Sequence, residues 1–216
     1  MKVGILALQG DVREHARILV KLGAEPIKVK SKQDLYDIDA LIIPGGESTT
    51  IGMLMKKYKL DTAIKEKHKH GMPIYGTCAG AIVLAKDIIG ATKQPKLNLA
   101  DISIIRNDYG RQLESFEAEL SIKDIGSFNG IFIRAPTIKS FYNGVKILSE
   151  HKNNPVMVRQ ENILITTFHP ELTDDTRIHE YFLNMAAEYK EVRDMQRDIE
   201  ESPDCKKPIP LNTTNA

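Results

Sequence analysis

The fold is decided by residues 72–85, which read MPIYGTCAGAIVLA. Apolar residues at the start of this stretch predict a buried strand, and the apolar run at its end predicts a helix. Between them lies a turn that carries Cys78, flanked by Gly76 and Gly80. Glycines at these places let the strand and the helix approach each other closely. The stretch is therefore typical of a nucleophile elbow, and we expect Cys78 to stand exposed at the helix N-terminus.

A second motif, His169-Pro170-Glu171, supplies the groups that a nucleophilic cysteine needs. The thiolate is the reactive form of cysteine, and the positive end of a helix dipole favours it. Proline pushes the residue before it toward extended geometry, in which side chains two residues apart point the same way. We therefore expect Glu171 to lie beside His169 and to orient its ring.

Each motif alone has a simpler interpretation. A lone cysteine in an intracellular chain is usually a small core residue, and an isolated His-Pro-Glu sequence is more often a surface loop. The flanking glycines, and the presence of both motifs in one chain, favour Cys78, His169 and Glu171 as catalytic residues.

The sequence Pro44-Gly45-Gly46-Glu47-Ser48 follows another apolar run. In doubly wound sheets, ligands bind beyond the carboxyl ends of the strands, where Cys78 is also expected. The backbone N–H groups of Gly46 and Ala79 are therefore candidates for an oxyanion hole. A glycine pair after a strand can equally be a tight turn. No Gly-Lys-Ser/Thr follows, so the segment is not a phosphate loop.

Composition restricts the other functions. The 216 residues include 30 basic and 29 acidic side chains, a net charge of +1 that does not favour nucleic acid or an anionic membrane. No apolar run is long enough to span a membrane, and the two cysteines, Cys78 and Cys205, fit a reducing compartment. We expect a cytoplasmic protein. His68 and His70 lie among lysines, so we expect no metal site.

Strand-like and helix-like segments alternate over residues 1–85. Apolar runs predict strands at 1–8, 27–29, 40–43 and 72–75, and other segments predict helices at 12–22, 50–58 and 61–70. This predicts an α/β fold with a flavodoxin-like, doubly wound, mostly parallel sheet and helices on both faces. Short runs at 102–105, 116–120, 130–133 and 145–148 predict a small, partly antiparallel strand region in the second half. Segments 156–158 and 163–165 predict a hairpin or a return to the main sheet.

The C-terminal part changes in composition. Residues 177–190 predict an amphipathic helix that closes a single domain over residues 1–190. Residues 191–216 are charged and then contain prolines, which predicts an extension that begins as a fraying helix and continues as a loosely ordered end, with Cys205 as an inert thiol.

Three motifs in this order, Pro-Gly-Gly, Gly-x-Cys-x-Gly and His-Pro-Glu, resemble those of the class I (triad) glutamine amidotransferases. More narrowly, four segments resemble the glutaminase subunits of pyridoxal 5'-phosphate synthase: Gly4–Asp11 with Glu14-His15, Pro44–Thr50, Arg106–Gln112 and Phe116-Glu117. The resemblance covers about residues 2–190 and leaves the extension without an interpretation.

This resemblance implies a chemistry. Cys78 would attack the side-chain amide of L-glutamine, and His169, oriented by Glu171, would handle the proton. Glutamate would be released through a γ-glutamyl thioester, and ammonia would pass to a separate synthase subunit. No cofactor would be bound. The implied glutamine contacts are Gly46, Glu47, Ser48, Arg106, Ile133 and Arg134.

The resemblance also implies that Gln9 helps to complete the oxyanion hole and faces the synthase subunit, so that activity without the partner would be low. Three alternatives stay open at this point: a glutaminase subunit for a purine, histidine or other pathway, a cysteine hydrolase of related fold, and a catalytically silent binding module.

Overall fold

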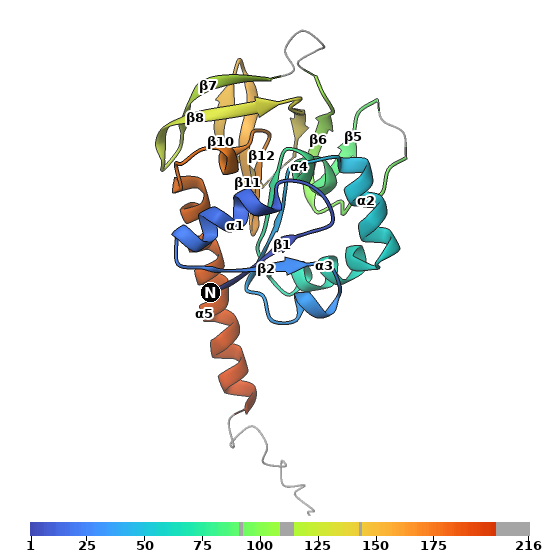
Figure 1. Cartoon of the computed structure of the whole chain (residues 1–216), viewed down its shortest axis with the longest axis vertical. Coiled ribbons are helices and arrows are strands. Elements are labelled where there is room, and N and C mark those ends of the chain that lie inside the picture. The colour runs from blue at the N-terminus through green and yellow to red at the C-terminus, as the bar shows by residue number, and fades with distance from the viewer. Residues whose placement is uncertain (91–92, 109–114, 143, 202–216) are drawn as a thin grey trace, which may run out of the picture.

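The computed structural model describes residues 1–90, 93–108, 115–142 and 144–201, and its central element is a sheet of seven strands in the order β10-β11-β12-β4-β3-β1-β2 (Figure 1). Five of these strands are parallel: β1 (Lys2–Leu6), β2 (Glu25–Val29), β3 (Ala40–Ile43), β4 (Ile74–Thr77) and β12 (Ile163–Thr166). If the five parallel strands are numbered 1 to 5 along the chain, so that β12 is the fifth, their spatial order from the β2 edge is 2-1-3-4-5. This is the flavodoxin-like arrangement. The predicted fold class is confirmed.

The edge beyond β12 is antiparallel. It is formed by β10 (Val145–His151) and β11 (Asn154–Gln160), and β11 pairs with β12 as a hairpin. The sequence predicted either a hairpin or a return to the main sheet for segment 163–165. In the structure it does both, since it forms a hairpin with β11 and pairs with β4 in the main sheet.

Helices cover both faces of the sheet. One face is covered by α1 (Val12–Lys21) and α5 (Arg177–Glu201), and the other by α2 (Ser48–Lys57), α3 (Leu60–Lys69) and α4 (Ala79–Leu84); the 3₁₀ turn η1 spans Gln33–Leu35. Alternate residues of a strand point to opposite faces. In β3, Leu41 and Ile43 accordingly pack with α2, α3 and α4, whereas Ala40 and Ile42 pack with α1 and α5.

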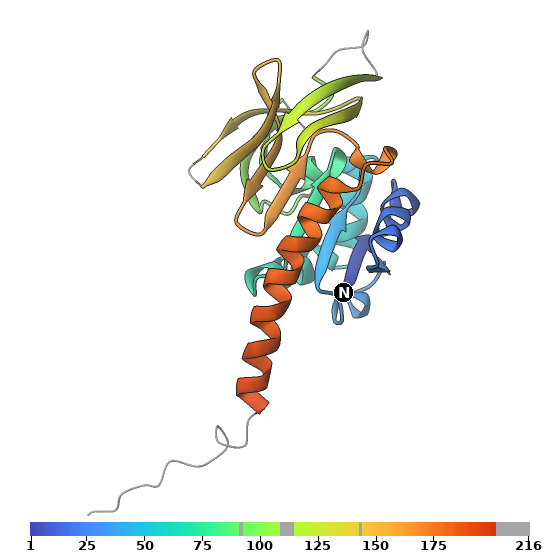
Figure 2. The same cartoon turned by 90° about the vertical axis from the view of Figure 1, so that its left-hand side faces the viewer.

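Two smaller sheets lie beside the carboxyl ends of the parallel strands. One contains β5 (Ala85–Ile88), β6 (Ala100–Ile105) and β9 (Thr137–Phe141), and the other is the hairpin of β7 (Ser115–Ile122) and β8 (Gly126–Ile133) (Figures 1 and 2). In these two sheets all pairings except β5–β6 are antiparallel, which confirms the predicted partly antiparallel region. Segment 145–148, which was predicted to belong to this region, lies instead in β10 of the main sheet. Strands β5 and β9 are additions that the sequence did not predict.

The last helix is longer than its amphipathic segment. The predicted helix over 177–190 is present, and α5 continues through Glu201 and projects beyond the sheet (Figures 1 and 2), where the extension was expected to begin as a fraying helix. Arg193 anchors it through an ion pair with Asp39, whose Oδ1 atom lies 2.7 Å from the Arg193 Nη2 atom. Cys205 lies outside the described residues, as do residues 109–112 of one family motif.

Among the described residues, no helix combines the length and the apolar character that crossing a bilayer requires.

Candidate active site

Cys78 lies on a sharp turn between β4 and α4, as the sequence predicted. Its φ of 45° is in the left-handed region, which a non-glycine residue rarely adopts. A Cβ atom on Gly80 would come within 2.0 Å of the Ile43 carbonyl oxygen, and one on Gly76 within 2.8 Å of the Gly80 carbonyl carbon. Only glycine fits at these two positions, because β3, β4 and α4 touch through their backbones there. The helix itself is short and ends at Leu84.

The expected exposure of Cys78 is wrong. The residue is only 7% exposed, because the end of β8 covers it: its Sγ lies 3.9 Å from the carbonyl oxygen of Ile133. The Cys78 N–H donates to the carbonyl oxygen of Thr166 at 2.9 Å, which ties the turn to β12. The thiol therefore forms part of a cavity wall rather than standing on an open surface.

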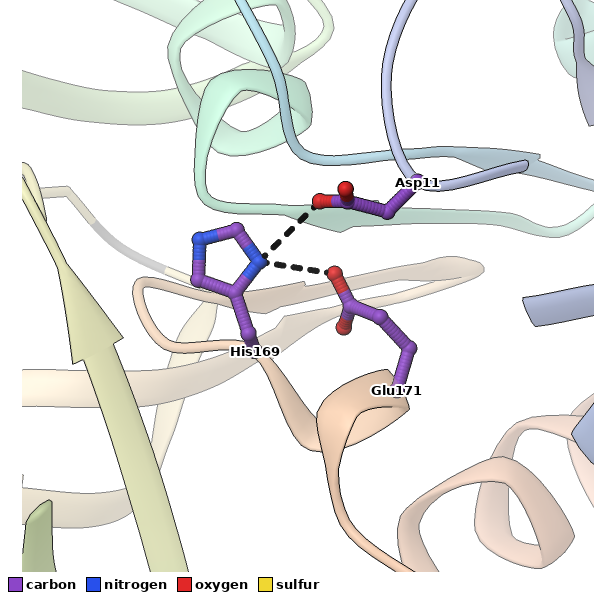
Figure 3. Close-up of side chains that lie close together, drawn as sticks. All are labelled: Asp11, His169 and Glu171. Atoms are coloured by element: carbon purple, nitrogen blue, oxygen red, sulfur yellow. Dashed lines mark hydrogen bonds and ion pairs between the residues drawn. The ribbon is translucent and has the colours of Figure 1, made fainter. Parts of the chain in front are cut away.

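His169 and Glu171 lie side by side directly after β12. The His169 Nδ1 atom and the Glu171 Oε1 atom are 2.8 Å apart, a hydrogen bond seen in Figure 3. The contact is confirmed, but the predicted extended backbone is wrong, since Pro170–Leu172 forms a 3₁₀ turn, η2. Proline is well suited to the first position of such a turn. The His169 N–H donates to the carbonyl oxygen of Ile131 in β8, which fixes the start of the turn.

Asp11 is a second acidic group beside His169, and the sequence did not reveal this position. It occupies the N-cap position of α1, yet its side chain makes no capping hydrogen bond. Instead, its Oδ2 atom lies 3.4 Å from His169 Nδ1 (Figure 3). Burial disfavours the protonated ring, but hydrogen bonds with Asp11, Cys78 and Glu171 outweigh burial and raise the pKa of His169 above its usual range.

In the described part of the chain, Asp11, His169 and Glu171 come nearest to a metal-binding arrangement, since their ligand atoms lie within 4.8 Å of one another. However, atoms that share a tetrahedral zinc ion are separated by about 3.3 Å, given zinc–ligand distances of about 2 Å. The 2.8 Å between His169 and Glu171 is instead a hydrogen-bond distance. The absence of a metal stays a prediction.

A cavity of about 290 Å³ opens beside Cys78 and gathers most of the predicted site. Its predicted lining residues are Gln9, Gly46, Glu47, Ser48, Cys78, Ala79, Arg106, Ile133, Arg134 and His169. Asp11, Ile82, Asn107 and Leu172 complete the lining and were not predicted. Glu171 lies behind His169 and is fully buried. The volume is small for a ligand pocket and suits a single amino acid. A larger hollow of about 780 Å³, lined by η1, α3 and α5, holds no cysteine.

The loops after β1 and β3 form one side of this cavity. Gln9 Oε1 accepts a hydrogen bond from the Glu47 N–H at 2.6 Å, and a Cβ atom on Gly46 would lie 2.4 Å from that same oxygen. Gly46 has φ of 146°, a conformation that favours glycine. Gln9 thus fixes the loop that carries Gly46. Its carboxamide oxygen accepts the hydrogen bond of the Glu47 N–H, so this donor is already used. At the opposite side, Ala79 is the first residue of α4, where N–H groups have no acceptor within the helix.

The two predicted arginines differ in their surroundings. Arg106 Nη2 pairs with Glu47 Oε1 at 2.9 Å, and its Nη1 donates to Gln94 Oε1 at 2.9 Å and to Thr49 Oγ1 at 3.1 Å. Its guanidinium is therefore already oriented when it faces the cavity. Arg134 follows β8, has φ of 43° and is exposed. Gln94 and Thr49 were not predicted, because no local pattern marks them.

Comparison with known proteins agrees with this geometry. The model of the SNO glutamine amidotransferase family matches residues 5–188. The pyridoxal 5'-phosphate synthase subunit PdxT of Kosmotoga olearia is 52% identical over 185 residues, which cover 85% of this chain and 96% of that protein. A PdxT protein of Thermus thermophilus is 49% identical, with coverage of 85% and 97%.

Solved structures give the same result. A crystal structure described as a glutamine amidotransferase superposes with a TM-score of 0.84 at 48% identity, and covers 86% of this chain and 98% of that one. A crystal structure from Thermoplasma acidophilum, described as a putative GMP synthase protein, shares the fold, with a TM-score of 0.62 at 18% identity and coverage of 90% and 98%. The chain belongs to the SNO glutamine amidotransferase family.

Proposed function

We propose that this chain is the glutaminase subunit of a pyridoxal 5'-phosphate synthase, and that it hydrolyses L-glutamine to L-glutamate and ammonia. The observation that carries the proposal is the meeting of Cys78, His169 and Glu171, from separate parts of the chain, at an amino-acid-sized cavity. Identity of about half with PdxT relatives over nearly their whole length supports this pathway over purine or histidine synthesis.

In the proposed reaction, the Cys78 thiolate attacks the side-chain amide carbon of glutamine. The carbonyl oxygen becomes an oxyanion, which would accept hydrogen bonds from the N–H groups of Gly46 and Ala79, two residues that line the cavity. Protonated His169 gives its proton to the leaving amide nitrogen, so ammonia departs and a γ-glutamyl thioester remains. His169 then takes a proton from water as the water attacks the thioester, and the C–S bond breaks, which releases glutamate and restores the Cys78 thiolate beside protonated His169.

The partner belongs to the same proposal. Ammonia would pass to a synthase subunit, and Gln9 would face that subunit from the rim of the cavity. Because the Gln9 carboxamide now holds the Glu47 N–H, we propose that docking changes this loop and completes the oxyanion hole. The alternatives, a cysteine hydrolase or a silent binding module, fit the cavity less well, since neither needs an amino-acid-sized site with two arginines.

The test is a glutaminase assay on the full chain, alone and with a pyridoxal 5'-phosphate synthase subunit. We expect glutamate release from glutamine, low for the chain alone and raised by the synthase subunit, and no hydrolysis of asparagine. Full activity of the isolated chain would contradict the proposed role of the partner. No activity in either state would contradict the proposed reaction.

We also predict that Arg106 and Arg134 bind the charged end of glutamine, because a carboxylate taken out of water needs a cationic donor. Arg106→Gln and Arg134→Gln should each raise KM for glutamine by about tenfold or more, with kcat changed by less than about threefold. The matched control is Arg159→Gln, since Arg159 contacts Tyr181 on α5 and does not line the cavity. Unchanged KM in both variants, or an equal effect in the control, would contradict this assignment.

For the domain organisation, we propose a single catalytic domain over residues 1–190. The family model ends at residue 188, and the PdxT relatives align over almost their whole length without the extension. The described part of residues 191–216 is a continuation of α5.

A further inference from the structure

A row of buried polar side chains runs away from the cavity behind Glu171. Thr77, His15 and His179 are all fully buried and come from β4, α1 and α5. Thr77 Oγ1 lies 3.4 Å from Glu171 Oε1 and 3.3 Å from His15 Nε2, and His15 Nδ1 lies 2.9 Å from His179 Nε2. His15 Nε2 is also 3.6 Å from Glu171 Oε1, a charge contact beyond hydrogen-bond range. The reaction described above uses none of these three side chains.

The carboxylate of Glu171, at one end of the row, sets the donor and the acceptor of every hydrogen bond in it. An ionised carboxylate only accepts, so the Thr77 hydroxyl donates to Glu171, and its oxygen accepts from a proton on His15 Nε2. Burial lowers the pKa of His15 and of His179, so both rings are neutral. His15 Nδ1 therefore accepts from His179 Nε2. This leaves His179 Nδ1 without a proton, and that atom has no hydrogen-bond partner among the described residues. All three donors thus point toward Glu171.

The orientation of the Glu171 carboxylate depends on these donors, because within the described residues only one of its two oxygens makes hydrogen bonds. Its Oε1 atom contacts His169, Thr77 and His15, whereas Oε2 has no hydrogen-bond partner in the described part of the chain. Asp11 offers His169 Nδ1 a competing carboxylate at 3.4 Å, on the cavity side. If the carboxylate of Glu171 turned, the His169 ring could follow Asp11 and leave its alignment with Cys78.

We propose that His15, acting through Thr77 and backed by His179, is a positioning residue that keeps Glu171 as the partner of His169. The inference rests on the proposed function of the triad. It assigns to the row a task beyond filling the core, since oriented donors replace water around a fully buried carboxylate. The charged and titratable groups around His169 that bear on this task are Asp11, Glu171, Cys78 and His15.

Three variants test this proposal in the full chain with its synthase subunit. Thr77→Val removes the hydroxyl at constant shape, His15→Phe removes the ring nitrogens, and His15→Gln keeps a donor near the Nε2 position. Removing the partner that orients a catalytic group typically costs 10- to 100-fold, so we expect Thr77→Val and His15→Phe to lower kcat by about tenfold or more. KM should change by less than about threefold, and His15→Gln should recover most of the loss. The effects of Thr77→Val and His15→Phe should not add, because both break one chain.

Thr166→Val is the matched control. Thr166 pairs with Thr77 across β12 and β4, is equally buried, and bonds to Tyr75 and the Phe168 carbonyl instead of the row. It should lose stability but keep kcat within about twofold of the parent. If Thr77→Val also keeps kcat while only its melting temperature falls, the row is a packing feature and the proposal is wrong. Thr77→Val decides the matter even if His15→Phe does not fold.

A second readout is independent of glutamine hydrolysis. Iodoacetamide alkylates a thiolate, and a well-placed Glu171 favours the protonated His169 that stabilises the Cys78 thiolate. At pH 6.5, Thr77→Val should therefore react about tenfold more slowly than the parent, and Thr166→Val at the parent rate. Equal rates for Thr77→Val and the parent would overturn the proposal. A parent that is alkylated readily but hydrolyses no glutamine would instead overturn the proposed function alone.

Discussion

Cys78→Ala is expected to abolish glutamine hydrolysis while leaving the fold nearly unchanged. Removing the nucleophile of an acyl-transfer triad costs roughly 10⁴- to 10⁶-fold in kcat, because no other group can form the covalent intermediate. Here the Cys78 thiol lines the cavity, with its sulfur held near the Ile133 carbonyl. The measurement is glutamate release in the presence of the synthase subunit.

The structural cost of this substitution should be small. Alanine keeps the Cβ atom, so the strain of the left-handed backbone at position 78 is unchanged. Losing one buried sulfur costs about 1 kcal/mol, which corresponds to a melting-temperature shift of about 2–4 °C for a chain of this size. Cys205→Ala is the control for a general cysteine effect and should keep full activity. Activity of Cys78→Ala above about one thousandth of the parent value would contradict the role of the thiol.

His169→Asn is expected to have the second largest effect, with kcat lowered by roughly 10³- to 10⁴-fold. Asparagine can keep a hydrogen bond to Glu171 near the place of Nδ1, but it cannot exchange a proton with Cys78 or with the departing nitrogen. The raised pKa of His169 means that the ring enters the reaction protonated, so its loss also removes the positive charge beside the thiol. Alkylation of Cys78 at neutral pH should slow together with hydrolysis.

The control for this variant is His70→Asn. His70 is exposed at the end of α3, where its Nδ1 lies 2.7 Å from the carbonyl oxygen of Glu66. This variant should hydrolyse glutamine at the parent rate. If His169→Asn retained more than about a tenth of the parent kcat, another base would have to serve Cys78 and the triad would be wrong.

The elbow could be predicted from the sequence because its causes are local. A strand, a helix and two closely spaced glycines leave few other conformations for Cys78, and the close contacts at Gly76 and Gly80 show why. Most of the parallel sheet was predictable for a similar reason, since β1, β3, β4 and β12 are largely apolar strands with a turn or helix beside them, whereas the edge strand β2 is more polar. The short strands β5 and β9 show only a weak alternation of apolar and polar residues. They form strands because both pair with β6.

Asp11 and the buried histidines behind Glu171 could not be predicted as parts of the site, because their positions there depend on contacts between distant segments. Asp11 fits a helix cap equally well, and only the packing of the β1–α1 loop against Gly45 brings its carboxylate to His169. His15 and His179 are 164 positions apart and meet only because α1 and α5 cover the same face of the sheet. In contrast, the contact of Glu171 with His169 was predictable from two residues, although the backbone that achieves it is a turn.

The most direct test of the central claim is covalent labelling of the full chain by a glutamine analogue that carries an electrophile at the side-chain carbonyl position. We expect one label per chain, located at Cys78 by peptide mass spectrometry, and protection by an excess of glutamine but not of asparagine. The label should be absent from Cys78→Ala and strongly slowed in His169→Asn. Labelling at Cys205, or labelling of Cys78 that glutamine does not prevent, would contradict the assignment of this cavity as a glutaminase site.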